Sequence, residues 1–261
     1  IYLGYIAGKI VGENALVGWM TAFILALSEW HIFYSTNARG YLVIMMLGQI
    51  CFVKLLKRLK EDKKIVRNDG QKVNILFNSL GWFLIWAVGS WTLPTFIFFE
   101  LSVATFLIGI IFSRKLVLMG SENAFFIPLI TLLAGMVVSY FQYYVWISPE
   151  MLASAKSNAA QTYLSSLFNE VAVQWLSPFE QLKIIFLILA MIGLWNLWKK
   201  KPTTLFLIVS ILLGPIIAGI IGFKLGLLPG IPHARTYFYL QPLFIILAAS
   251  GILKIGTVLR I

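Results

Sequence analysis

Residues 203–223 read TTLFLIVSILLGPIIAGIIGF, a continuous apolar run with no charged side chain. A helix of this length crosses the roughly 30 Å hydrocarbon layer of a bilayer. Similar runs recur along the chain, and they are continuous, whereas the strands of a membrane barrel are short and alternate strictly. The sequence therefore predicts an all-α fold, a polytopic membrane helical bundle. Within this run, Gly214-Pro215 favours a kink or a break.

Composition supports a lipid environment. Only 12% of the residues are charged and 60% are hydrophobic, with a mean hydropathy of +0.88; soluble chains are about a quarter charged. The net charge of +11 does not indicate nucleic acid, because the basic residues sit in short loops between apolar runs. The one cysteine, Cys51, excludes a disulfide within the chain, and His31 and His233 are far apart in sequence. No metal site is predicted.

About eight spans are expected in a single transmembrane domain over residues 1–261: 15–33, 41–56, 73–91, 95–112, 125–147, 182–198, 203–223 and 237–253. Residues 148–180 are the one long polar excursion. Their apolar side chains recur at helical spacing, which predicts an amphipathic helix on the outer membrane surface. Residues 1–10 are too short to span, so we expect an approach segment or the remnant of an earlier element.

The basic residues predict the orientation of the chain. Residues 54–72 are the most basic segment, and with this segment cytoplasmic, residues 114–115 and 199–201 fall on the same side. Every span then alternates without contradiction to the positive-inside rule. We expect both termini in the cytoplasm, and a bacterial-type inner or plasma membrane.

Arg39 is the foremost candidate on the predicted outer side. It lies between Tyr34 and Tyr41, at the start of an expected helix. The planar guanidinium binds phosphate through two hydrogen bonds, and a helix N-terminus adds unpaired N–H donors. The alternative is that Arg39 contacts lipid headgroups or forms a salt bridge. In the functional interpretation, Arg39 contacts the phosphate of a donor substrate, and the two tyrosines lie beside it.

Four further residues are candidates. Arg235 follows a loop rich in glycine and proline, and it fits either a second phosphate or sugar ligand or an interfacial anchor. His233 could donate a hydrogen bond there, or be a simple surface histidine. Glu100 lies within an expected span, where a carboxylate must be protonated, paired or facing water. Glu29 lies near the outer end of the first span.

Two stretches carry a family resemblance. Residues 22–41 read AFILALSEWHIFYSTNARGY, and residues 235–251 read RTYFYLQPLFIILAASG. The first, with Tyr2-Leu3-Gly4 before it, resembles the third and fourth helices of GT-C-type glycosyltransferases. The second is similar to their late helix. This group depends on polyprenyl-phosphate sugars and includes protein O-mannosyltransferases and lipid A aminoarabinose transferases.

The resemblance implies sugar transfer from an isoprenoid phosphate on the non-cytoplasmic side, without a nucleotide. Arg39 would then lie near the donor phosphate, and Arg235 would be a weaker candidate for the same cavity. In that family the catalytic acid lies in the first outer loop, which has no counterpart in residues 1–261. Either roughly a hundred residues precede Ile1, judged from span lengths, or the protein is a divergent, non-catalytic relative.

Three functions remain open from the sequence. The first is a glycosyltransferase, whole or in part, with the missing acid as general base and Arg39 holding the leaving phosphate. The second is a non-catalytic membrane subunit of a larger complex that binds lipid or pigment, which nine tryptophans and twenty phenylalanines would suit. The third is a lipid or solute transporter, favoured by Gly214-Pro215 and Glu100. Expected partners are membrane lipids and other membrane subunits, not nucleic acid, and the only candidate cofactor is the polyprenyl-phosphate sugar as donor.

Overall fold

The computed structural model describes residues 1–36, 40–61, 75–92, 95–115, 123–146, 171, 182–225 and 234–259. Within these ranges every regular element is a helix and no residue is in a strand, which confirms the all-α prediction. The helices are α1 (Tyr2–Gly12), α2 (Ala15–Leu27), α3 (Glu29–Thr36), α4 (Tyr41–Glu61), α5 (Ile75–Thr92), α6 (Phe96–Lys115), α7 (Asn123–Trp146), α10 (Lys183–Lys200), α11 (Pro202–Lys224), the 3-10 helix η3 (Ala234–Leu240) and α12 (Gln241–Val258).

Three of the described segments are long and apolar enough to cross a membrane: Phe96–Ser113, Pro202–Lys224 and Tyr237–Val258. Two shorter apolar helices accompany them, Ala15–Leu27 and Phe125–Ser139. Large apolar side chains also point outward, and the exposed fraction reaches 62% for Trp195 and 68% for Trp198. Such an apolar exterior suits contact with lipid. These helices support a membrane location.

The first expected span, at residues 15–33, is wrong as a single helix. The structure has two helices there, α2 and α3, separated by Ser28 in an extended conformation with φ −69° and ψ 114°. The Ser28 hydroxyl accepts a hydrogen bond from the His31 backbone N–H at 3.3 Å, which is the contact that begins a new helix. Neither helix alone has the length of a membrane span.

The remaining helices agree closely with the expected ranges. The helix α4 continues to Glu61, beyond the expected end at residue 56, and the expected span at 237–253 divides into η3 and α12. The helix α11 runs without a break from Pro202 to Lys224, so the break considered at Gly214-Pro215 is absent. The surface helix expected at residues 148–180 lies outside the described residues, except for Val171.

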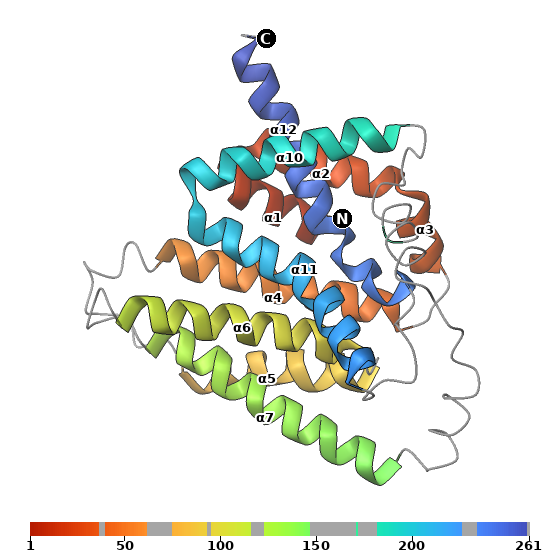
Figure 1. Ribbon diagram of the computed structural model, residues 1–261, viewed down its shortest axis with the longest axis vertical. Helices are drawn as coiled ribbons and strands as arrows, with labels where there is room; N and C mark the ends of the chain where they lie inside the picture. The colour runs from red at the N-terminus through yellow and green to blue at the C-terminus, as the bar shows by residue number, and fades with distance from the viewer. Residues whose placement is uncertain are drawn as a thin grey trace.

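The N-terminal part of α12 lies in the core of the bundle, and its C-terminal end projects beyond the other helices (Figure 1). Its residues from Gln241 to Gly251 are all buried, and α1, α2, α10, α11 and η3 pack around it. The closest approach is to α10, where Gly193 lies against the Leu247 carbonyl and Gly251 against the Leu189 carbonyl. Glycines permit this approach because a Cβ at either position would overlap the facing backbone.

The short helix α1 is also part of the core. Its buried residues are Gly4, Ala7, Gly8 and Val11, and it packs against α2, α4 and α12. It is therefore an integral helix of the bundle rather than an approach segment.

Basic side chains gather where α4 and α10 end. Lys54 and Arg58 lie over the ring of Trp82 on α5, at 4.5 and 5.8 Å from its centroid. Lys60 and Lys200 line one cavity. The structure thus brings together Lys60 and Lys200, two of the lysines that the sequence assigned to one side of the membrane.

Candidate functional site

The predicted site residues fall unevenly on the described chain. Arg39 and His233 lie outside the described residues. Tyr34 belongs to α3 and Arg235 to η3, but their side chains are not among those described. Tyr41 is the first residue of α4 and is half-buried. The candidate site is therefore defined by the described elements that flank these residues.

The two stretches that carry the family resemblance meet in the fold. The helix η3, which contains Arg235, packs against α4, which begins two residues after Arg39. The Gln241 side-chain amide donates a hydrogen bond of 2.9 Å to the Ser28 hydroxyl, across 213 positions of sequence. Both groups are buried. The start of α12 is thereby tied to the start of α3, so the described residues 28–36, 40–41 and 234–241 lie at one end of the bundle.

The backbone beside Arg39 is held closely against α5. A Cβ at Gly40 would lie 2.6 Å from the Thr92 Cγ2 atom and 2.9 Å from its carbonyl oxygen, so no larger residue fits. The Gly40 carbonyl accepts from the Ile44 N–H at 3.1 Å, which makes Gly40 the first hydrogen-bonding residue of α4. The first N–H groups of a helix have no partner within it and attract anions. Arg39 therefore directly precedes a helix N-terminus suited to a phosphate.

Glu100 is fully buried on α6. The Ser90 hydroxyl of α5 donates a hydrogen bond of 2.8 Å to its Oε1 atom. The Oε2 atom has no hydrogen-bond partner within the described part of the chain. The Ser90 hydroxyl, which is neutral, is thus the one described hydrogen-bond partner of the Glu100 carboxyl group, and no described base is paired with it. Glu29, by contrast, is exposed in the first turn of α3, and no described contact joins the two acids.

Sequence reasoning missed a buried polar group beneath this end. The Gln49 side chain of α4 and Tyr239 of η3 line a small cavity together with Phe99. The rings of Phe99 and Tyr239 meet edge to face at 5.7 Å. Neither the Gln49 Oε1 atom nor the Tyr239 hydroxyl has a hydrogen-bond partner among the described residues. The signal in the sequence was a glutamine inside each of two apolar runs, Gln49 and Gln241.

The described residues contain no group of three or more His, Cys, Asp or Glu side chains that could hold a metal ion. Cys51 is buried in the core and carries a free thiol. What the described geometry offers at this end is the N-terminus of α4, its contact with η3, and a buried polar layer that contains Gln49 and Tyr239. Such an arrangement can bind an anionic group and stabilise negative charge.

Comparison with known proteins gives no match: no family model, curated protein or solved structure is significantly similar to this chain.

Proposed function

We propose that this chain is a membrane glycosyltransferase of the GT-C type, or a major part of one, which uses a polyprenyl-phosphate sugar as donor. One observation carries the proposal. The two stretches that resemble the family, far apart in sequence, adjoin through the contact of η3 with α4 and the bond from Gln241 to Ser28. A donor site assembled from both stretches needs this proximity.

In this proposal Arg39 binds the donor phosphate and stabilises the charge that develops on it as the glycosidic bond breaks. An arginine suits this role because its fork contacts two phosphate oxygens and stays charged at any physiological pH. The N-terminus of α4 adds backbone donors to the same phosphate. Arg235 supplies a second contact, to the phosphate or to the sugar, from η3.

The proposal includes a topology of eight spans, with α2 and α3 together forming the first. Both termini lie in the cytoplasm of a bacterial-type inner membrane, and lipids and other membrane subunits are the partners. Support comes from the three long apolar helices, from the exposed tryptophans of α10, and from the lysines grouped where α4 and α10 end. Positive charge at one end of such helices is typical of the cytoplasmic side.

The test is a transfer assay in proteoliposomes, with polyprenyl-phosphate mannose and polyprenyl-phosphate glucose as donors and release of polyprenyl phosphate as readout. Arg39→Ala and Arg39→Lys should both abolish release, since an ammonium cannot reproduce the two-pronged contact. Lys199→Ala is the control: this exposed lysine on α10 loses only a contact with the Trp195 ring. If correctly folded wild-type protein releases nothing from either donor yet retains bound lipid, the non-catalytic subunit becomes the better explanation.

A further inference from the structure

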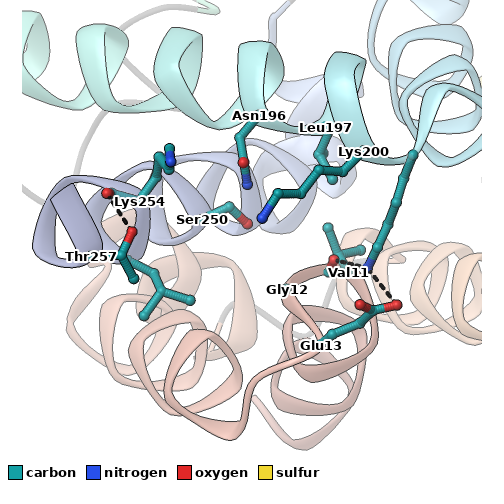
Figure 2. Close-up of a pocket in the computed structure, with 11 residues that line it drawn as sticks. Val11, Gly12, Glu13, Asn196, Leu197, Lys200, Ser250, Lys254 and Thr257 are labelled. Carbon is teal, nitrogen blue, oxygen red and sulfur yellow. Dashed lines mark hydrogen bonds and ion pairs between the residues drawn. The ribbon is translucent and has the colours of Figure 1, made fainter.

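A second polar cavity lies where α1, α10 and α12 meet (Figure 2). It encloses about 110 Å³, the volume of a few water molecules at about 30 Å³ each. A neighbouring cavity of about 270 Å³ shares three of its residues, Glu13, Lys200 and Lys201, and adds Lys60. The charged groups lining the two are four lysines and one carboxylate: Lys60, Lys200, Lys201, Lys254 and Glu13.

These two adjoining cavities are remote from the proposed donor site. Lys60 belongs to the last turn of α4, and Tyr41 is the first residue of the same helix. At a rise of 1.5 Å per residue, the two ends of α4 are roughly 30 Å apart. No residue of the proposed donor site lines either cavity, so any ligand here is separate from the sugar donor.

One of the four lysines already has a counter-charge. The Lys201 ammonium forms an ion pair with the Glu13 carboxylate at 2.9 Å and donates to the Val11 carbonyl at 2.8 Å. Glu13 occupies the turn between α1 and α2 with a left-handed φ of 52°, a conformation that non-glycine residues seldom adopt. Lys201 thus has a structural role, fastening this turn to the junction of α10 and α11.

The other lysines are not compensated. The ammonium groups of Lys200 and Lys254 have neither an ion pair nor a hydrogen bond within the described residues. Figure 2 shows Lys200 and Asn196 extending from α10 toward Ser250 on α12. Two ammonium groups that line one cavity repel each other, and an anion with several acceptor oxygens would relieve this repulsion and could also accept a hydrogen bond from the neutral amide of Asn196. A phosphate group meets that description.

We propose that this cavity binds the phosphate of an anionic phospholipid. A lipid source is favoured over free phosphate because Trp195 and Trp198 of α10 are exposed one turn or so from Lys200, and such tryptophans mark the headgroup region. Basic pockets between membrane helices are typical headgroup sites on the cytoplasmic side. The bound lipid would bridge the end of α10 to α12, so it stabilises the bundle without taking part in sugar transfer.

The experiment measures lipid binding to the purified chain in neutral detergent by native mass spectrometry, with phosphatidylglycerol and phosphatidylcholine as the probes. The variant Lys200→Gln/Lys254→Gln removes the two uncompensated charges. The matched control, Lys57→Gln/Lys199→Gln, removes the same charge from two exposed lysines that line neither cavity. Inorganic phosphate is titrated separately as a competitor.

We expect the wild-type chain to bind phosphatidylglycerol more tightly than phosphatidylcholine. The cavity variant should lose about thirtyfold in affinity, since each lysine–phosphate hydrogen bond in the cavity contributes about fivefold, while the control, whose lysines line neither cavity, should lose clearly less. Equal losses in both double variants would overturn the proposal, because the effect would then be general surface charge. Equal binding of phosphatidylcholine and phosphatidylglycerol would also overturn the proposal. If inorganic phosphate binds as tightly as phosphatidylglycerol, the ligand of the cavity is free phosphate and not a lipid. None of these outcomes depends on whether the chain transfers a sugar.

Discussion

The crossing of α10 and α12 gives a prediction whose size follows from the structure. At Gly251 an added Cβ would overlap the Leu189 backbone carbonyl, whereas ordinary contacts begin at 3.4 Å. The two helices would have to separate, along a stretch of α12 that is buried throughout. Overpacking of this kind costs about 1–3 kcal/mol. Replacing glycine by alanine in a helix returns about 1 kcal/mol, so Gly251→Ala should lose up to about 2 kcal/mol overall.

Gly256 provides the matched control on the same helix. A Cβ there has nothing within 4 Å, so Gly256→Ala should gain helix propensity without a clash, by up to about 1 kcal/mol. The double variant Gly193→Ala/Gly251→Ala should cost less than the sum of its parts. Both substitutions force the same separation of α10 from α12, and effects at shared contacts are not additive.

The assay is unfolding of the purified chain in mixed micelles, followed by tryptophan fluorescence. Each kcal/mol should shift the midpoint by about 2–4 °C for a chain of this size, so Gly251→Ala should melt below wild type and Gly256→Ala at or above it. Equal midpoints for the two alanine variants would refute the reasoning, because the helices would then not meet at Gly251.

Two further predictions concern buried hydrogen bonds. Ser90→Ala removes the described donor to Glu100 and should cost about 1–3 kcal/mol of unfolding free energy. The control is Thr105→Ala, which should cost far less because the described hydrogen bond of this hydroxyl is to the carbonyl of Leu101 in its own helix. Similar losses in the two variants would contradict the role of Ser90. Gln241→Leu should destabilise the chain and also lower sugar transfer, and a double-mutant cycle with Ser28→Ala should give a coupling of about 1 kcal/mol. A coupling near zero would mean that the two side chains act independently.

Much of the fold could be predicted from hydropathy alone. The ranges of α5, α6, α7, α10 and α11 follow the apolar runs closely, since long runs without charge have few alternatives to helix. The break at Ser28 was missed because a hydropathy average does not register a single serine whose hydroxyl accepts from a backbone N–H in the first turn of the next helix. The same average treated α1 as peripheral, although its small residues fit it into the core.

The candidate site was predictable only in part. Arg39 and Arg235 were chosen from their local sequence, and the meeting of their flanking segments depends on a hydrogen bond between residues 213 positions apart. No local pattern specifies such a bond. Gln49 and Gln241 could have been noticed as amides within apolar runs, because a buried amide requires a partner. The lysine cavity needed the tertiary structure, since its walls come from α1, α10 and α12.

In the proposed function, the segments around Arg39 and Arg235 build one site for a polyprenyl phosphate. The most direct measurement is photocrosslinking of the membrane-embedded chain with a polyprenyl phosphate that carries a photoreactive group next to its phosphate, followed by peptide mapping. We expect label in both segments, lost on competition with unlabelled polyprenyl phosphate and in Arg39→Ala. Label confined to lipid-exposed positions such as the outer face of α10, unchanged by the competitor, would contradict it.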